Sequence, residues 1–307
     1  MVKQSFEAER QQRLDQALAR RWPHLDRAAI HRAVRDGAVS VNERTATSAG
    51  QMLEAGDRIS ADLPEEGETS ERLPVLLPVR TLHADEALLV VEKPAGVPLL
   101  PDAETGIQSV AEVLIEREPA LAHVGGAQRA GIVTPMETEV SGLILVGRDE
   151  ATYRRLKGEV NRGRVERRYI ALVEGLLKGE GVIEAPIGNR RHERRRLRVS
   201  RTGRAATTRY RALTTYRLLG RTYTLVELRP DSARRHQLRV HLAWYGTPIV
   251  GDRLYGSRRQ ELLDDRLFLH LGQMRFRHPQ TGEWITVQSP LPEALDSLLR
   301  YLRRPRR

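Results

Sequence analysis

The chain has 307 residues, of which 40% are hydrophobic, and its 51 Lys and Arg against 40 Asp and Glu give a net charge of +11. This length is enough for one large and one small domain, each with a hydrophobic core. The absence of cysteine excludes disulfides, thiol catalysis and cysteine-ligated zinc or iron–sulfur sites.

The charge indicates the class of partner. Most of the excess is arginine, whose planar guanidinium suits contacts to phosphate and stacking on bases. RNA, DNA or an acidic protein would each fit a pI near 10.4. No apolar stretch is long enough to span a bilayer, and the charged start is not typical of a signal peptide. We therefore expect a cytoplasmic monomer without a membrane segment, and no His or carboxylate spacing predicts a metal site.

The first part of the chain predicts a small domain that can fold by itself. Residues 13–22 and 25–34 have apolar side chains at helical spacing, and residues 38–42 predict a short strand after an Asp-Gly turn. Residues 64–78 are rich in Glu, Pro and Thr and show no sustained periodicity, which is typical of a linker.

Three parts follow from this composition. We expect a small domain at residues 1–63, a linker at 64–79 and a large domain at 80–307.

The large domain begins with alternating strand and helix patterns. Residues 88–91 predict a buried strand that is closed by a turn at 93–96, and residues 107–115 predict a helix. Further along, residues 151–160 predict a helix and residues 167–173 a strand.

A short acidic loop lies between two apolar runs in residues 129–146, RAGIVTPMETEVSGLILV. Residues 132–133 and 143–146 predict buried strands on either side. Pro135 restricts the loop between them, and Glu137 is its central carboxylate. From these residues alone, a solvated hairpin loop without a function is the favoured interpretation.

The densest positive run is residues 190–211, RRHERRRLRVSRTGRAATTRYR. Such runs are usually solvated faces or loops. In a protein that binds RNA, each phosphate neutralised by this run would release counterions.

The frame of the acidic loop, Arg-Ala-Gly-Ile-Val before it and Ser-Gly-Leu-Ile-Leu-Val after it, resembles the active-site segment of the RluA-type RNA pseudouridine synthases. In that family the loop reads His-Arg-Leu-Asp followed by a Lys-Asp-Thr-like triplet, and its Asp is catalytic. Here the loop is residues 134–140, TPMETEV, so the resemblance implies that Glu137 takes the place of the catalytic Asp.

Other segments carry the same resemblance. The strand with Lys-Pro-Ala-Gly at 85–96 is similar to the family's first strand, and Tyr169 aligns with the tyrosine that lies against the target base. A tyrosine in such a strand is otherwise most often core packing. Arg239, in Arg-His-Gln-Leu-Arg, corresponds to the basic residue that pairs with the catalytic carboxylate. A buried pair of this kind would keep the acid ionised at neutral pH.

The N-terminal part resembles the S-four type of RNA-binding module in Arg-Leu-Asp at 13–15, RAVRDGAVSVN at 32–42 and Gly-Asp-Arg-Ile at 56–59. In the synthase family, a basic hairpin arches over the substrate where the arginine run lies here. The residues implied as RNA contacts are Arg27, His31, Arg32, Arg35, Arg194, Arg195, Arg196, Arg234 and His236.

The resemblance implies an α+β fold, with a mixed and largely antiparallel central sheet crossed by a cleft, next to a small N-terminal module. It also implies an isomerase that converts uridine to pseudouridine in structured RNA, ribosomal or transfer, without a cofactor. The loop departs from the family at Glu137 and at Thr134-Pro135, where His-Arg stands, and Ala233 and Arg235 replace Gly and Thr. The alternative is a catalytically inactive RNA-binding protein on the same scaffold. A DNA-binding regulator rests on charge alone.

Overall fold

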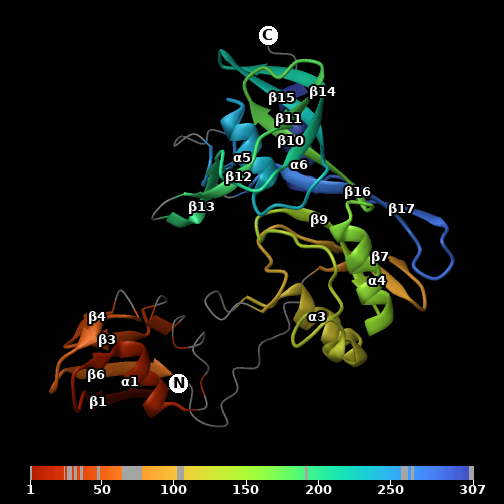
Figure 1. The fold of residues 1–307 in the computed structure, drawn as a ribbon. Coiled ribbons are helices and arrows are strands. Elements are labelled where there is room, and N and C mark those ends of the chain that lie inside the picture. The colour runs from red at the N-terminus through yellow and green to blue at the C-terminus, as the bar shows by residue number, and fades with distance from the viewer. Residues whose placement is uncertain are drawn as a thin grey trace. The chain divides into compact units, whose positions relative to one another are not determined.

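The computed structural model describes residues 2–23, 25, 30, 33–34, 37–46, 49–63, 78–101, 107–190, 193–256, 262–263 and 266–303. The chain divides into two compact units (Figure 1). The N-terminal unit is Met1–Leu77 with Pro101–Ser109, and the large unit is Pro78–Leu100 with Val110–Arg307. The expected linker at 64–79 falls almost wholly outside the described residues.

In the described part of the N-terminal unit, helix α1 (Leu14–Arg21) packs against small sheets. Leu14 and Leu18 are fully buried, as their spacing predicts. The helix expected at 25–34 lies mostly outside the described residues. The strands are β1 (Val2–Glu7), β2 (Gln12–Arg13), β3 (Val39–Val41), β4 (Arg44–Thr45), β5 (Met52–Leu53) and β6 (Arg58–Leu63).

The order of the larger N-terminal sheet is β1-β6-β3-β4, with all neighbours antiparallel. Strand β3 confirms the strand expected at 38–42, although it is shorter.

The large unit is built on a nine-stranded sheet in the order β11-β14-β15-β10-β16-β9-β8-β7, with β17 paired to β16. Every neighbouring pair is antiparallel except β9 and β16, which are parallel. The sheet therefore confirms the mixed, largely antiparallel fold. Its strands are β7 (Arg80–Ala84), β8 (Leu88–Lys93), β9 (Ser141–Gly147), β10 (Glu166–Glu174), β11 (Glu180–Glu184), β14 (Thr207–Leu218), β15 (Arg221–Pro230), β16 (Leu269–Arg277) and β17 (Trp284–Gln288).

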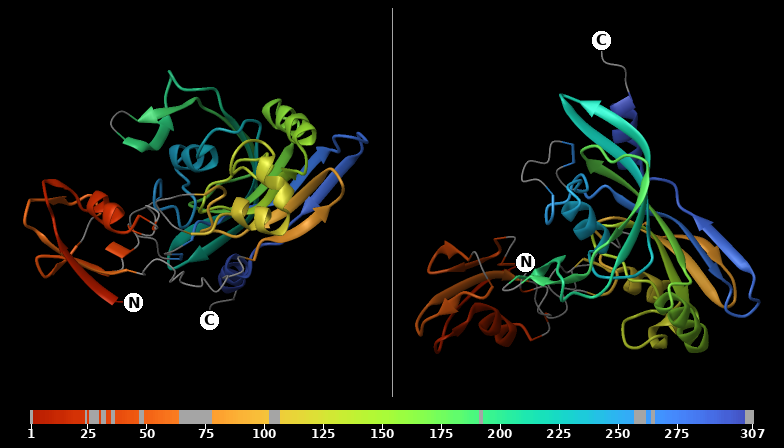
Figure 2. Two further views of the ribbon diagram at one scale, coloured as in Figure 1. Left: turned by 90° about the horizontal axis from the view of Figure 1, so that it is seen from below. Right: turned by 45° about the horizontal axis from the view of Figure 1, so that its top comes forward.

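A separate antiparallel hairpin, β12 (Ile187–Arg190) with β13 (Glu193–Val199), carries much of the arginine run. The helices of the large unit are α3 (Val110–Arg117), the 3₁₀ helix η1 (Pro119–His123), α4 (Glu150–Asn161), α5 (Gln237–Trp244) and α6 (Glu293–Arg303). Helix α4 packs along β9, α5 along β13, β14 and β15, and α6 along β14 (Figure 2). None of the described helices is long and apolar enough to cross a membrane.

The start of each helix depends on which groups accept hydrogen bonds from the backbone N–H groups of its first turn. Helix α4 starts as expected, because the Asp149 side chain accepts the Thr152 N–H at 2.8 Å. Helix α3 begins three residues after its expected start at 107. The amides of Val110 and Ala111 instead donate to the carbonyls of Pro98 and Leu99, at 3.0 and 3.2 Å.

Strand β9 is buried along its whole length, which confirms the prediction for residues 143–146. The expected strand at 132–133 is only a single bridge, Ile132 to Val146, with the Val133 N–H donating to the Leu145 carbonyl. The acidic loop therefore returns to the sheet along β9.

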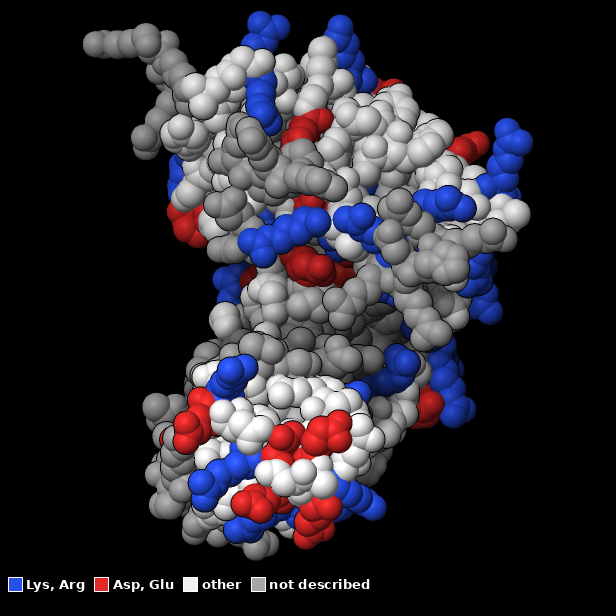
Figure 3. Space-filling view, turned by 90° about the vertical axis from the view of Figure 1, so that its left-hand side faces the viewer, with Lys and Arg blue, Asp and Glu red and all other residues white. Residues whose placement is uncertain are grey.

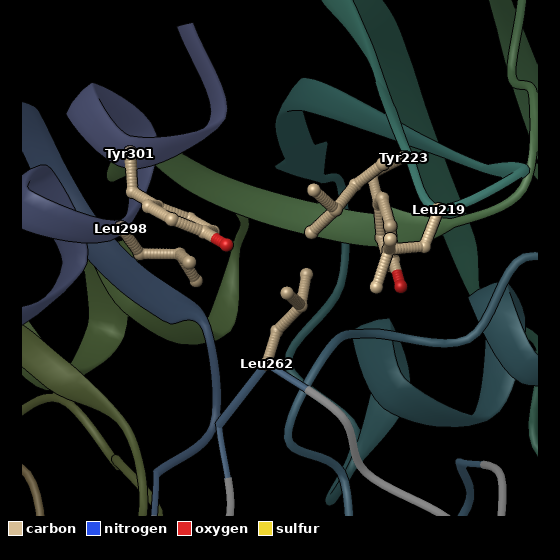
Figure 4. A pocket seen from close by; sticks show the side chains of 6 residues that line it. Leu219, Tyr223, Leu262, Leu298 and Tyr301 are labelled. Carbon is tan, nitrogen blue, oxygen red and sulfur yellow. The ribbon is translucent and has the colours of Figure 1, made fainter. Parts of the chain in front are cut away.

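A pocket lined by leucine and tyrosine lies between the end of the β14–β15 hairpin and α6 (Figure 4). It is lined by Leu218, Leu219, Tyr223, Leu262, Leu298 and Tyr301. None of these residues belongs to the acidic loop.

Candidate active site

The acidic loop is held by hydrogen bonds to strand β9 and to the turn that follows β8. At its start, the buried Thr134 hydroxyl accepts the Leu145 N–H at 3.0 Å. At its end, the Thr138 carbonyl accepts the Gly96 N–H at 2.8 Å. These contacts place Glu137 at the tip of a constrained loop, and Thr134 anchors the loop at the position where the resembled family has histidine.

Gly142 lets the chain leave this loop close to its neighbouring strand. Its φ is +126°, and a Cβ atom there would lie 2.3 Å from the Leu271 carbonyl oxygen. Only glycine fits this approach without moving the backbone.

Glu137 is clamped by Arg239. The Arg239 Nη1 lies 2.6 Å from Glu137 Oε2, although the two residues are 102 positions apart in sequence. Arg239 is almost completely buried, while the Glu137 side chain keeps 24% exposure, so the carboxylate faces both the protein and the solvent. The structure thus brings together the arginine and the carboxylate that the resemblance pairs.

Asp252 holds the other side of the same guanidinium. Its two carboxylate oxygens accept Arg239 Nε and Nη2 at 2.9 and 2.8 Å, and it is only 1% exposed. Asp252 also accepts the backbone N–H groups of Leu254 and Tyr255, each at 2.9 Å. One arginine thus lies between two carboxylates, and bidentate contacts to the inner one fix its orientation.

His236 contributes both backbone and ring to the site. It adopts a left-handed conformation, with φ 54°, just before α5, and this turns its N–H toward Glu137 Oε1 at 3.1 Å. Its ring nitrogen Nε2 lies 3.7 Å from Glu137 Oε2. Burial, with Arg239 and Arg235 nearby, lowers the pKa of His236 to about 4, so the ring is neutral at pH 7.

Helix α5 is fixed to the sheet by polar contacts that set the position of Arg239. The His241 ring contacts the Thr208 hydroxyl and the Ala185 carbonyl, both at 2.9 Å. Gln237 donates to the Thr207 carbonyl at 2.9 Å. Because these residues flank Arg239 on an eight-residue helix, the guanidinium is carried by a rigid element.

Burial raises the pKa of Glu137 above its ordinary value, and the guanidinium of Arg239 opposes that rise. The nearby carboxylates of Glu139 and Asp252 add to the increase. Burial and the neighbouring carboxylates therefore raise the pKa of Glu137 while Arg239 lowers it, and desolvation is the larger effect.

Lys93 is fully buried beneath the loop. Its ammonium donates to the carbonyls of Pro94, Val97 and Thr138, at 2.8, 2.7 and 2.9 Å. Burial lowers the pKa of Lys93 to about 7, and the charges of Glu139 and Glu137 oppose this. The residue ties the end of β8 to the loop.

Tyr169 lies on β10 and is 8% exposed, within the main hydrophobic core. Burial raises the pKa of its hydroxyl, Arg167 opposes the rise, and Glu137 adds to it. The residue therefore packs as its strand position predicts and also lies within the electrostatic reach of Glu137.

The structure describes only some of the expected RNA contacts. Arg27, His31, Arg32 and Arg35 lie outside the described residues, and the side chains of Arg194 and Arg195 are likewise not described. Arg196 is half-buried on β13. Arg234 Nε donates to the Ala205 carbonyl at 3.1 Å. His236 turns its ring toward Glu137 rather than outward.

Asp252 and Lys93 belong to the site, but residue patterns did not single them out. Lys93 lies in the turn predicted at residues 93–96, and both Lys93 and Asp252 fall in segments covered by the family resemblance, from which no role was assigned to either. Within the described ranges, no group of three or more His, Asp or Glu residues is placed to hold a metal ion.

Comparison with known proteins identifies the scaffold. The profile of the RNA pseudouridylate synthase family matches residues 87–244, and that of the S4 domain, the S-four-type module, matches residues 12–59. The chain belongs to the RNA pseudouridine synthase family. This family is one of isomerases, and its combination here with an S4 domain implies RNA as the partner.

Relatives of similar length carry the same family name. A Bacillus subtilis protein named as the uncharacterized RNA pseudouridine synthase YlyB is 32% identical over 302 residues, covering 97% of this chain and 96% of that protein. The ribosomal large subunit pseudouridine synthase D of Vibrio parahaemolyticus is 31% identical over 306 residues, covering 95% and 91%.

A solved structure supports the fold of this pseudouridine synthase family member. Human RNA pseudouridylate synthase domain containing 1 has a TM-score of 0.58 at 22% identity, covering 80% of this chain and 98% of that chain. The resemblance and the fold class expected from the sequence are both confirmed.

Proposed function

We propose that this protein isomerises uridine to pseudouridine in structured RNA, with Glu137 as the catalytic carboxylate. The observation that carries the proposal is that two hydrogen bonds fix the Glu137 carboxylate, one from Arg239 at 2.6 Å and one from the His236 N–H at 3.1 Å. A glutamate has one more methylene than aspartate, and these contacts restrict the extra freedom of its longer side chain.

The reaction redistributes bonds within one nucleotide. The bond from the ribose C1′ to N1 of the base breaks, a bond from C1′ to C5 forms, C5 loses a proton and N1 gains one. In this proposal Glu137 acts at C1′, Arg239 positions it, and Tyr169 lies against the base. The uridine must first be extruded from its stack, which costs a few kcal/mol and is offset by pocket contacts.

Ribosomal RNA is the substrate that we favour over transfer RNA. The support is the name of the Vibrio parahaemolyticus relative, which is a synthase of the large ribosomal subunit. The S4 domain match adds a second RNA-binding element in the same chain.

The decisive test measures tritium release from RNA labelled at C5 of uridine. Large-subunit ribosomal RNA and a transfer RNA mixture, both transcribed without modifications, would be incubated separately with the full-length protein. Release from ribosomal RNA at catalytic amounts of enzyme is the expected result. Tight binding without release from either RNA would instead establish the inactive RNA-binding alternative.

The rate of isomerisation should depend on pH through Glu137. The carboxylate acts in its ionised form, and its pKa is raised, so activity is lost as the pH falls through that raised value. We expect the acid limb of kcat/KM to lie above the ordinary glutamate pKa of about 4.3. Initial rates of tritium release measured between about pH 4.5 and about pH 8 check this, and a limb at or below the ordinary value would contradict it.

The N-terminal part should fold and bind RNA alone. Fifteen of its described residues are apolar, buried and packed into one core, and the S4 match lies inside this part of the chain. A fragment of residues 1–77 should give a cooperative thermal transition by circular dichroism and should bind the ribosomal transcript in a filter assay. A fragment that is unfolded, or folded without affinity for RNA, would refute the assignment of residues 1–63 as an RNA-binding domain.

Affinity for RNA should fall steeply with salt. Figure 3 shows one face of the large unit, over which Lys and Arg side chains are spread with Asp and Glu between them. Replacing Arg194, Arg195 and Arg196 by Ala should flatten the plot of log affinity against log salt by up to about one unit per lost phosphate contact. Fluorescence anisotropy over a salt series measures the slope. An unchanged slope would show that the arginine run is a solvated face that does not contact RNA.

A further inference from the structure

His236 lies between Glu137 and a tyrosine from a different part of the chain. Its Nδ1 is 2.8 Å from the Tyr255 hydroxyl, and the two rings meet edge to face at 5.6 Å between centroids. The other ring nitrogen, Nε2, faces Glu137 Oε2 at 3.7 Å. The imidazole therefore connects a phenol to the carboxylate.

The direction of these hydrogen bonds can be assigned from the third partner. The Tyr255 oxygen already accepts the backbone N–H of Leu197 at 2.9 Å, which favours the arrangement in which its own O–H donates to His236 Nδ1. Burial raises the pKa of Tyr255 and keeps the phenol protonated. A neutral imidazole that accepts at Nδ1 carries its proton on Nε2, which is the nitrogen that faces Glu137.

The tautomer of His236 determines whether its ring attracts or repels the Glu137 carboxylate. With the proton on Nε2, the ring presents an N–H dipole to Glu137, which adds to the holds from Arg239 and from the His236 backbone. With the proton on Nδ1, a nitrogen lone pair would face the carboxylate and repel it. The Tyr255 hydroxyl therefore sets whether His236 attracts or repels Glu137.

The relay begins on the arginine-rich hairpin. Leu197 belongs to β13, and its side chain and Tyr255 pack on the small core of Ile187, Ala206 and Val240. Tyr255 is also positioned through its own N–H by Asp252, the carboxylate that orients Arg239. A shift of β13 would thus first change the hydrogen bond between the Leu197 N–H and the Tyr255 hydroxyl.

We propose that the Leu197 N–H, Tyr255 and His236 form a hydrogen-bonded relay through which the β12–β13 hairpin orients Glu137. Tyr255 and His236 are positioning residues in this relay. RNA held by the hairpin arginines would act on the carboxylate through it, so that substrate binding and alignment of the catalytic group are coupled. The catalytic consequence rests on the proposed function, whereas the relay itself does not.

The relay is tested in the full-length protein without RNA. Nitrogen-15 NMR of histidine-labelled protein, with a His236→Gln sample for assignment, should show His236 protonated on Nε2. Tyr255→Phe should redistribute the proton toward Nδ1 and speed hydrogen exchange at the Leu197 amide. The control Tyr210→Phe removes a hydroxyl that contacts Tyr245 at 3.3 Å, at the other end of α5, and should change neither.

Kinetics then separate positioning from structure. Tyr255→Phe should lower kcat for tritium release by about 10-fold while KM and RNA affinity change by less than about twofold, and Tyr210→Phe should match wild type. The relay is overturned if wild-type His236 carries its proton on Nδ1, or if Tyr255→Phe leaves the tautomer and kcat unchanged. A wild type with the expected tautomer but no tritium release would overturn the proposed function and leave the relay standing.

Discussion

Replacing Glu137 with Gln should lower the rate of uridine isomerisation by a factor on the order of 10³ or more while leaving RNA affinity within about twofold. Gln keeps the length of the side chain and can still accept the His236 N–H, but it has no charge with which to act at C1′. Because Arg239 retains Asp252 as a partner, the variant should unfold at the same temperature as wild type or higher. Single-turnover tritium release and thermal unfolding measure the two effects.

Two further variants bracket this result. Glu139→Gln makes the same change two residues away, at a side chain that is 53% exposed and 3.5 Å from Arg239, and should cost at most a few-fold. Glu137→Asp shortens the side chain and withdraws the carboxylate from Arg239 by roughly 1 Å, which should cost about 100-fold. Full activity in Glu137→Gln would remove the carboxylate from the mechanism altogether.

Arg239→Met should be the most destabilising single change in the site. It leaves Glu137 and Asp252 without the cation between them, and an uncompensated buried charge costs about 3–5 kcal/mol. For a domain of this size, that is a lowering of Tm by roughly 10 °C. The free energy of unfolding in urea gives the direct measurement.

The pH dependence distinguishes lost charge balance from lost packing. Without Arg239, the Glu137 carboxylate, whose pKa is raised by burial, takes up a proton in the folded state at pH values where the unfolded chain has already released it. The deficit relative to wild type should therefore shrink between about pH 7 and about pH 5.5. Adding Asp252→Asn should recover part of the loss. The control Arg154→Met breaks an exposed pair with Glu150 and should leave the free energy of unfolding nearly unchanged, and an equal loss in both variants would refute the argument.

The sequence was sufficient for the parts of the fold that local periodicity controls. Strand β9 is a continuous apolar run and is buried throughout, and α4 begins where Asp149 can cap it. The contact between Glu137 and Arg239 spans 102 positions, which no local pattern can encode, and it was anticipated only through the family resemblance.

The rest of the site depends on geometry that residue types do not reveal. His236 faces inward because its backbone is left-handed, a conformation that is uncommon outside glycine and has no signal in the sequence. Lysine is almost never fully buried, so the usual rule places Lys93 at the surface, whereas three carbonyls hold it in the core. Asp252 could be found only once Arg239 had a position.

The parallel contact between β9 and β16 has a mechanical consequence. It joins the strands through two residue pairs, whereas the adjoining antiparallel contacts of β8 with β9 and of β10 with β16 each have six. This contact between β9 and β16 has the fewest backbone hydrogen bonds in the sheet. We therefore expect the sheet to bend most easily there. Ser141 and Gly142, which form the seam on β9, directly follow the loop that carries Glu137. Glu137, the carboxylate that we propose to be catalytic, therefore lies on the loop that enters the sheet at this weakly paired seam.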